Sequence, residues 1–151
     1  MALSSHLTIS PATHAELPAV LELLRQSNLL ETGVAEAIDG FCVASTAGVV
    51  VGCAGLETHG ELGLLRSVAV HTSARGTGVG TRLVEAVTSA ASERRLRELF
   101  LLTTTAPRFF ERLGFESVLR SSVPPEIAES WEFRVGCPQT AIAQRRALNG
   151  R

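Results

Sequence analysis

The sequence predicts an α+β domain, a mixed and mostly antiparallel central sheet of about six or seven strands flanked by three or four helices. Two observations lead to this fold class. Short runs of β-branched and small apolar residues follow one another as in a meander, and amphipathic segments with helical spacing lie between them. The 151 residues, 45% of them hydrophobic, suffice for one buried core. We therefore expect a single domain over residues 1–151.

The first part of the chain predicts a strand, a helix and then three strands. "HLTIS" alternates as a short strand, and "THAELPAVLELLRQSN" places Leu17, Val20, Leu21 and Leu24 on one helical stripe. Thr13 and Glu16 have the spacing of a capping box at the start of that helix. "ETGVAEAIDG" is expected to be a loop with at most a short helix. "FCVAST", "GVVVGCAGLE" and "ELGLLRSVAV" then predict an antiparallel meander.

The second part predicts alternating helices and strands. Apolar residues recur at helical spacing after the glycine-rich stretch, at Val79, Leu83, Val84, Val87 and Ala91, and "ERR" ends this helix. "LRELFLLTT" is a strand, "APRFFERLG" a short helix closed by Gly114, and "FESVLR" a further strand. "SSVPPEIAESWEFRVG" is less regular, and "TAIAQRRAL" is expected to be the last strand.

Composition excludes several classes of function. The net charge is −1 and the basic residues are scattered, which argues against nucleic acid as a partner. The chain has no lysine and no tyrosine, so Schiff-base chemistry, a phosphate-loop lysine and a tyrosine acid are excluded. No apolar run reaches the roughly 18 residues of a membrane span. The N-terminus lacks a secretory pattern, and Cys42, Cys53 and Cys137 share no metal-ligand spacing. We expect a cytoplasmic protein without a metal.

"ARGTGVG", residues 74–80, predicts an anion site. A strand precedes it and a helix follows, so unpaired amides and the positive end of the helix dipole face the loop. The glycines remove side chains that would block phosphate oxygens, and Arg75 adds a permanent cation. A plain flexible turn is the alternative. A dinucleotide fingerprint would need glycine at Thr81.

The stretch "LLRSVAVHTSARGTGVGTRLVEAV" resembles the central motif of the GNAT-type N-acetyltransferases, and "FFERLGF" resembles a later motif of that family. The resemblance implies acetyl-coenzyme A as cosubstrate. By position, the backbone of Val68, Ala69 and Val70 would bind the pantetheine arm, and "LFLLTT" would splay from its neighbour to admit the thioester. The loop positions that would hold the diphosphate are Arg75, Gly76, Thr77, Gly78, Val79, Gly80 and Thr81.

The candidate catalytic groups come from three places. The amide of Val68 is expected to stabilise the oxyanion. Many family members carry a tyrosine acid where this chain has Phe110, which also belongs to the implied cofactor site. Thr103, Thr104 and Thr105 are candidates to bond the sulfur in its place, or simply satisfy backbone groups. Glu61 and His59, in the turn "ETHGE" that also holds Glu57, are the candidate bases; a solvated acidic hairpin is the alternative.

The acceptor is expected to be an anionic amine. Arg66 interrupts an apolar strand, so it either clamps a substrate anion or forms a structural ion pair with a glutamate such as Glu57. Arg134 and Thr103 complete the candidate acceptor residues. "LFLLTTTAPRFFERLGFESV" and "GCPQTAIAQRRAL" are similar to the arsenic-resistance N-acetyltransferases and to the acetyltransferase domain of N-acetylglutamate synthases.

That similarity implies direct acetyl transfer to a small acidic amino acid or to an arsenical or phosphinic analogue. Three alternatives remain open: a glutamate N-acetyltransferase, a non-catalytic acyl-coenzyme A binding module, and an arsenical-binding thiol protein. A homodimer is also expected, because exposed sheet edges often pair.

Overall fold

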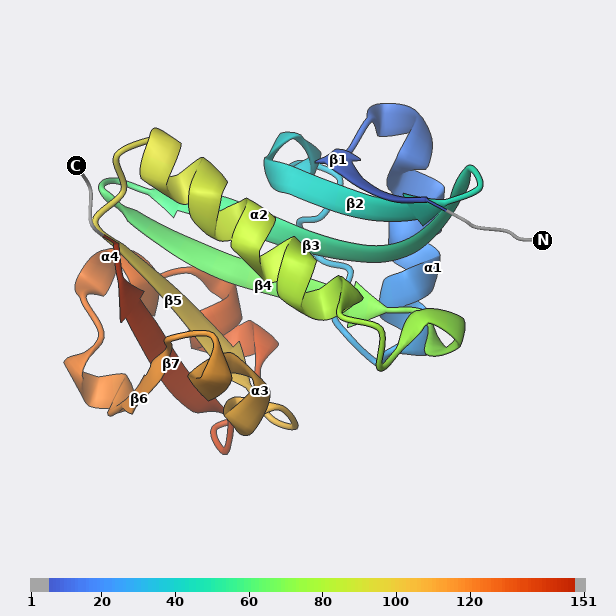
Figure 1. Ribbon diagram of the computed structural model, residues 1–151. Coiled ribbons are helices and arrows are strands. Elements are labelled where there is room, and N and C mark those ends of the chain that lie inside the picture. Colours follow the sequence, from blue (N-terminus) through green and yellow to red (C-terminus); the bar gives the residue numbers. More distant parts are fainter. Residues whose placement is uncertain (1–5, 149–151) are drawn as a thin grey trace. The chain divides into compact units, whose positions relative to one another are not determined.

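The computed structural model describes residues 6–148, which form two compact units (Figure 1). The first unit holds the residues up to Leu56 together with Ser67–Val87, and the second holds Glu57–Arg66 and the residues from Thr88 onward. The strands follow the hydrogen-bonded order β1-β2-β3-β4-β5-β7-β6. Strands β3 (Val49–His59) and β4 (Leu62–Val70) contribute to both units. The predicted α+β class with a mixed, mostly antiparallel sheet is confirmed.

The first unit begins with an antiparallel sheet. β1 (Leu7–Pro11) pairs with β2 (Phe41–Thr46), and β2 pairs with β3. The β2–β3 pairing places Val43 opposite Cys53, and Cys42 opposite Ala54. Because alternate residues of a strand face opposite sides, Cys53 and Cys42 point to opposite faces of the sheet. The two thiols therefore do not form a chelating pair for an arsenical.

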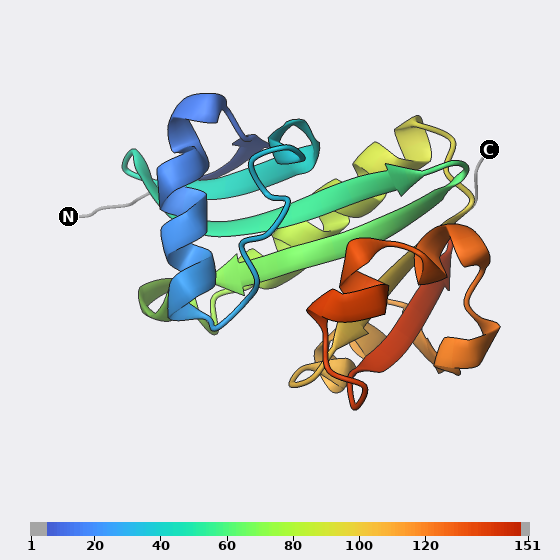
Figure 2. The ribbon, with the colours of Figure 1, turned by 180° about the vertical axis from the view of Figure 1, so that it is seen from behind.

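One face of this sheet packs against α1 (Leu17–Gln26), as Figure 2 shows. The predicted capping box is present in the short helix His14–Glu16, where the amide of Thr13 donates to the Glu16 carboxylate over 2.9 Å. The expected loop 31–40 contains one short helix, Ile38–Gly40. Together these elements bury a core: Val20, Leu23, Leu24, Val34, Ile38, Phe41, Val43, Cys53 and Ala69.

The other face of the sheet packs against the first part of α2 (Val79–Glu93). Gly52 permits the close approach, because a Cβ at this position would lie 2.9 Å from Leu83 Cδ1 and 3.1 Å from Val79 Cγ1. The thiol of Cys42 also lies 3.9 Å from the carbonyl oxygen of Leu83. The helix is thus seated directly over β3, and its N-terminus is fixed next to the end of β4.

In the second unit, β4 pairs with its neighbour β5 over only part of its length. β4 pairs in parallel with β5 (Glu98–Thr103) at three positions only, from Leu62 opposite Glu98 to Leu64 opposite Phe100. β5 continues to Thr103 as the antiparallel partner of β7 (Ile142–Ala147), which also pairs with β6 (Glu116–Val118). The predicted strand 115–120 is therefore shorter than expected, because Arg120 begins a short helix, Arg120–Ser122.

Three short helices complete the second unit: α3 (Pro107–Arg112), α4 (Pro125–Ala128) and η5 (Glu132–Gly136), which is a π-helical turn. α3 ends as predicted near Gly114, whose φ of +97° suits glycine. The guanidinium of Arg120 donates to the carbonyls of Phe133 and Pro138 and so anchors η5. The buried residues of this unit's cluster are Leu62, Leu64, Phe100, Val123, Ile127, Phe133 and Ala143.

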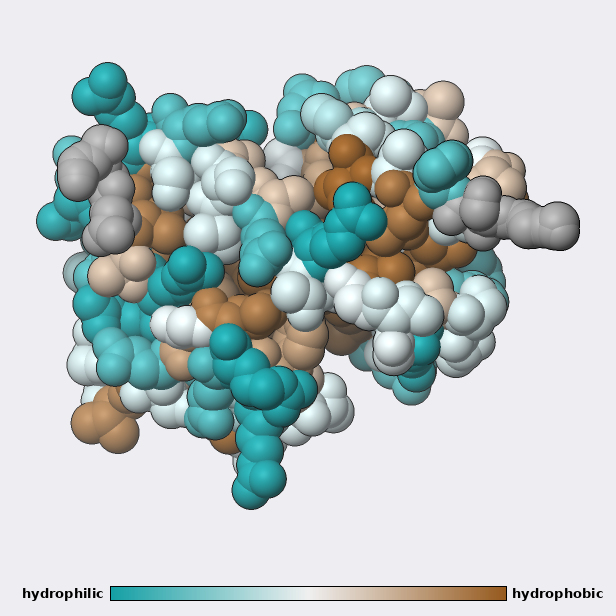
Figure 3. All heavy atoms as spheres, in the orientation of Figure 1, coloured by the Kyte–Doolittle hydropathy of each residue, from teal (hydrophilic) through white to brown (hydrophobic). Residues whose placement is uncertain are grey.

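The visible surface carries hydrophilic side chains interspersed with apolar ones (Figure 3). None of the helices within residues 6–148 is long and apolar enough to cross a membrane. In the same described range, no three histidine, cysteine, aspartate or glutamate side chains form a group able to hold a metal ion.

Candidate active site

The glycine-rich loop of the first unit has an open backbone. Gly76 and Gly78 have φ values of +79° and +87°, a conformation that residues with a Cβ seldom adopt. A Cβ at either position would meet no atom within 4 Å, so the surface above these glycines is unobstructed. Arg75 donates from Nε to the carbonyl of Val70 over 3.0 Å, and the Thr77 hydroxyl donates to the carbonyl of Ala74. The first bond ties the loop to the end of β4, and the second lies within the loop.

The loop leads directly into the N-terminus of α2. The amide of Arg82 donates to the carbonyl of Gly78 over 3.1 Å, one helical turn earlier. The amides of Val79, Gly80 and Thr81 precede that bond and lie where an α-helix provides no acceptor. The helix dipole adds about half a positive charge at this end. A helix N-terminus, its positive dipole end and an open glycine surface are features that suit a diphosphate, so the predicted loop residues stay candidates for binding it.

A strained residue precedes the loop on β4. Ser67 has a φ of +61°, although it is neither glycine nor in a turn. The carbonyl of Ser67 accepts a hydrogen bond from the Cys53 thiol over 3.3 Å. A left-handed residue inside a strand costs about 1–2 kcal/mol and changes the direction of the next amide, here that of Val68. Nothing in the sequence distinguishes Ser67, so sequence reasoning missed this feature of the candidate oxyanion site.

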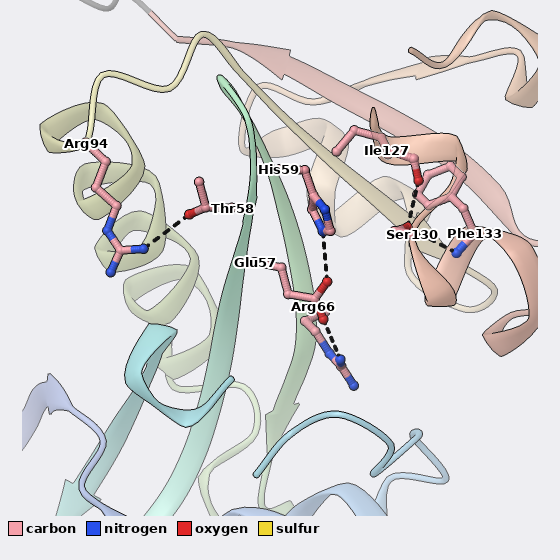
Figure 4. Close-up of polar contacts among 8 residues, drawn as sticks. All are labelled: Glu57, Thr58, His59, Arg66, Arg94, Ile127, Ser130 and Phe133. Carbon is pink, nitrogen blue, oxygen red and sulfur yellow. Dashed lines mark hydrogen bonds and ion pairs between the residues drawn. The ribbon is translucent and has the colours of Figure 1, made fainter. Parts of the chain in front are cut away.

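A charged cluster lies on the β3–β4 hairpin of the second unit (Figure 4). Arg66 Nη1 donates to Glu57 Oε2 over 2.7 Å, and His59 Nε2 lies 3.0 Å from Glu57 Oε1. Glu57 and His59 are two residues apart and share one face of β3, whereas Thr58 points the other way and bonds to Arg94 over 3.3 Å. One carboxylate thus joins an arginine and a histidine.

The electrostatics of this cluster follow from its partial burial. The Arg66 side chain is 4% exposed, and that of Glu57 is 23% exposed. Burial by itself would raise the pKa of Glu57, but the hydrogen bonds and charges of Arg66 and His59 outweigh it and lower that pKa below its usual value. Glu57 is therefore ionised at neutral pH. The sequence alternative of an Arg66–Glu57 ion pair is what the structure contains.

The segment η5 adds a second carboxyl near Arg66. Burial raises the pKa of Glu132, while the positive charge of Arg66 partly opposes that rise. The Cys137 thiol donates to Glu132 Oε2 over 3.5 Å, and Oε1 is shielded from solvent without a hydrogen-bond partner within the described residues. Sequence reasoning missed Glu132 because it lies in an irregular segment. Its only signal was the position of a glutamate between two aromatic residues, Trp131 and Phe133.

The other site residues predicted from the sequence do not belong to the cluster of Glu57, His59 and Arg66. Glu61 forms an exposed ion pair with Arg97 over 2.9 Å, and the structure does not join it to His59. The hydroxyl of Thr103 accepts a hydrogen bond from the amide of Ala106 over 3.0 Å, in the turn that precedes α3, and Thr104 is exposed. Arg134 is exposed on η5. Phe110 is buried between Phe109 and Phe115 in edge-to-face contacts.

The family described as "Acetyltransferase (GNAT) domain" matches residues 37–117, which include β2 to β5, the glycine-rich loop and α2. The chain belongs to the GNAT acetyltransferase family. The resemblance inferred from the loop and from "FFERLGF" is thereby confirmed, and with it the assignment to the acyltransferases. Acetyl-coenzyme A is the acyl donor of this GNAT family.

Two relatives are similar in sequence to this GNAT chain. An N-acetyltransferase of Chlorobaculum tepidum is 33% identical over 116 residues, which are 76% of this chain and 72% of that protein. The amino-acid acetyltransferase of Pasteurella multocida is 28% identical over 136 residues, covering 84% of this chain but 31% of that protein. The GNAT chain thus spans about a third of the amino-acid acetyltransferases that it matches.

Solved structures have the same fold. An N-acetylglutamate synthase of Neisseria gonorrhoeae, complexed with coenzyme A and N-acetyl-glutamate, superimposes with a TM-score of 0.82 at 22% identity. That match covers 97% of this GNAT chain and 36% of the synthase. A Mycobacterium tuberculosis protein in complex with coenzyme A has a TM-score of 0.82 at 27% identity, covering 93% of this chain and 99% of that one.

Proposed function

We propose that this chain transfers the acetyl group of acetyl-coenzyme A to the amino group of a small acidic amino acid, or of an arsenical or phosphinic analogue of one. The observation that carries the proposal is the open glycine-rich loop joined to the N-terminus of α2, which fits the diphosphate of the donor. The relatives named amino-acid acetyltransferase support an amino acid as the acceptor.

The donor contributes a thioester whose carbonyl is ready for attack by an amine. In the proposal, the chain binds its diphosphate through the amides of Gly76–Thr81 and the charge of Arg75, and its pantetheine arm through the backbone of Val68, Ala69 and Val70. The amide of Val68 then stabilises the negative charge that develops on the thioester oxygen. One such donor typically contributes about 3 kcal/mol to the lowering of a barrier.

The acceptor's acidic group is assigned to Arg66, with Arg134 and Thr103 as further candidates. The guanidinium of Arg66 donates to the Glu57 carboxylate, and its planar, permanently charged form suits recognition of a carboxylate or an arsonate. The N-acetylglutamate synthase complexed with coenzyme A and N-acetyl-glutamate supports an acidic acceptor by analogy of fold alone.

Direct attack of the amine is proposed rather than transfer through an enzyme thiol. Burial raises the pKa of Cys42 to about 11 and that of Cys53 to about 12. Burial, with the nearby Glu132 carboxyl, raises the pKa of Cys137 to about 12. Because the thiolate is the nucleophilic form, none of the three thiols is suited to accept the acetyl group at neutral pH. His59 and Glu61 stay the candidate bases, and Thr104 the candidate partner of the leaving sulfur.

The test is the release of free thiol from acetyl-coenzyme A in the presence of single acceptors. The panel holds glutamate, aspartate, an arsenical and a phosphinic glutamate analogue, with glutamine, leucine and lysine as amino acids that lack an acidic side chain. We expect turnover with at least one acidic acceptor and much slower release with leucine and lysine. Release no faster than hydrolysis with every acceptor would count against an enzyme of this specificity.

A second candidate is a non-catalytic acyl-coenzyme A binding module, which the buried Phe110 favours, because phenylalanine cannot protonate a departing thiolate. Titration calorimetry separates the two: binding of coenzyme A without acetylation of any acceptor supports the binding module.

We also propose a homodimer. Sedimentation equilibrium of the same samples tests it, because the measured mass distinguishes one chain from two.

A further inference from the structure

We propose that Glu57 is a positioning residue that holds the ring of His59 in its Nε2–H tautomer, so that Nδ1 is the atom that takes the proton from the acceptor's ammonium group. The proposal rests on the proposed acetyl transfer and deepens it. It assigns the base to His59 rather than Glu61, and gives Glu57 a role that the sequence motifs did not assign.

The two oxygens of the Glu57 carboxylate have different partners. Oε2 accepts a hydrogen bond from Arg66 over 2.7 Å, and Oε1 lies 3.0 Å from Nε2 of His59. An ionised carboxylate has no proton to donate, so it acts only as an acceptor. A hydrogen bond at Oε1 therefore requires the proton on Nε2. The carboxylate fixes the tautomer of the ring, as an acid does for a histidine in other catalytic pairs.

The opposite nitrogen of the His59 ring, Nδ1, is the candidate base. With the proton on Nε2, neutral imidazole carries its lone pair on Nδ1. For residues 6–148, the structure gives the His59 ring one hydrogen bond, the contact with Glu57. The side chain is also 27% exposed, at the end of β3, so the ring can be approached from solvent. Nδ1 is thus an accessible acceptor, and the contact between Nε2 and Glu57 sets the orientation of the ring.

Glu57 is held in turn by Arg66. The Arg66 guanidinium is almost fully buried and keeps the carboxylate charged. The charged and titratable groups around the cluster are His59 and Glu57 on β3, Arg66 on β4, and Glu132 with Cys137 in and after η5. Glu61 of the same turn instead pairs with the exposed Arg97. Arg66, the residue assigned to the acceptor's acidic group, is therefore connected to the base through a single carboxylate.

The proton transfer balances with groups that the proposal names. The ammonium of the acceptor gives one proton to His59 Nδ1 and becomes a neutral amine, and the ring becomes an imidazolium. The amine nitrogen then forms a bond to the acetyl carbon while the carbon–sulfur bond breaks. The second proton on that nitrogen passes to the departing thiolate, and the imidazolium returns its proton to water.

The positioning role is tested without any substrate, by NMR of the full chain labelled with ¹⁵N and ¹³C in histidine. On the high-pH plateau of the ring shifts, we expect the His59 shifts of the Nε2–H tautomer in the wild type. In E57Q the amide can donate or accept, so the preference should be lost. E61Q, the matched removal of a carboxylate two residues from His59, should keep the wild-type shifts. An Nδ1–H tautomer in the wild type, or unchanged shifts in E57Q, overturns the positioning role.

E57Q also removes the bonded anion of a buried arginine, so its amide spectrum is recorded first to establish folding. Should it fail to fold, E57D replaces it. This variant keeps the carboxylate charge but withdraws it by one methylene, and the expected result is a weaker preference for the same tautomer. A tautomer population in E57D equal to that of the wild type contradicts the assignment.

The catalytic role is tested by kinetics with the acceptor that the thiol assay identifies. We expect kcat of H59Q to fall by about 10²–10⁴-fold with little change in the KM for acetyl-coenzyme A. The pH dependence of kcat/KM that a titrating base produces should be absent from H59Q. E57Q should lower kcat less than H59Q does. Full activity of H59Q with an unaltered pH profile overturns the role as base. If no acceptor is acetylated by the wild type, the proposed function fails, while the NMR result still decides the link between Glu57 and His59.

Discussion

Arg66 carries a permanent charge in a largely buried side chain, so its environment governs its energetic effect. Removing one partner of a buried ion pair leaves the other charge without compensation, which is costlier than removing both. The sequence alone predicted that this arginine needs a partner, because it interrupts an apolar strand. It could not decide between a substrate anion and a glutamate, since that choice depends on how β3 and β4 align.

We expect R66M to lower the free energy of unfolding by about 3 kcal/mol, because Glu57 then loses its bonded cation. The double variant E57Q/R66M should be less destabilised than R66M. R97M, which removes the exposed partner of Glu61, should cost less than about 1 kcal/mol. Urea unfolding measures all three, and a double variant less stable than R66M would falsify the ion-pair account.

The raised pKa of Glu132 leads us to expect that its contribution to stability decreases as the pH rises. Its folded-state pKa is raised by burial above the ordinary value of 4.5, so between these two values the folded state binds more protons than the unfolded state. Its contribution to stability therefore falls as the pH rises through that window. Glu57, whose pKa is lowered, contributes in the opposite sense: its stabilisation is present above pH 4.5 and is lost as the pH falls.

E132Q removes the titrating group at that site and leaves Glu57 in place. The difference in free energy of unfolding between E132Q and the wild type should therefore grow in favour of E132Q from pH 4.5 upward, and then level off. E129Q removes an exposed carboxylate three residues away and should show no such trend. Denaturant titrations at a series of pH values measure both. If the difference in free energy of unfolding between E132Q and the wild type does not change with pH, burial does not disfavour the ionised form of Glu132.

At the scale of elements, most strands and helices were predictable because their apolar periodicity was undisturbed. β2 coincides with "FCVAST", and α2 follows the stripe from Val79 to Ala91. The segment 121–136 was not predictable in detail. Its π-turn is held by the Arg120 guanidinium on the carbonyls of Phe133 and Pro138, contacts that no local pattern encodes. The left-handed Ser67 likewise reflects tertiary constraint rather than residue preference.

The glycine-rich loop offers a matched pair of substitutions. Gly76 and Gly48 have nearly equal φ values, +79° and +80°, and a Cβ at either would meet no atom within 4 Å. G76A and G48A should therefore each lose about 1 kcal/mol of stability from backbone strain alone. Only G76A should also weaken the binding of coenzyme A in calorimetry, because its new methyl group projects from the candidate diphosphate surface. Equal binding by the two variants would contradict the assignment of the loop.

At the scale of the whole molecule, the sequence predicted the fold class and the order of the elements, since the meander and the helices that follow it are locally encoded. The division into two compact units was not predictable, because it depends on where the long strands β3 and β4 change their packing partners. The expectation of one domain over 1–151 extends past the described residues and stays a prediction.

Neither unit is built from one continuous stretch of chain, because each takes part of β3 and of β4. Unfolding one unit would disrupt strands that the other requires. We therefore expect a single cooperative thermal transition, with calorimetric and van't Hoff enthalpies that agree. Two resolved transitions in scanning calorimetry would show that the units melt independently.

The high pKa values of the three cysteines limit unwanted acylation of the protein by the thioester that it is proposed to bind. A protein that binds an activated thioester is exposed to adventitious acylation at any nucleophile of its own. Here Cys42, Cys53 and Cys137 remain protonated at neutral pH, and the chain contains no lysine amine. The side chains thus present the reagent with no ready nucleophile of these two kinds, and prolonged incubation with acetyl-coenzyme A should leave the intact mass unchanged apart from the N-terminal amine.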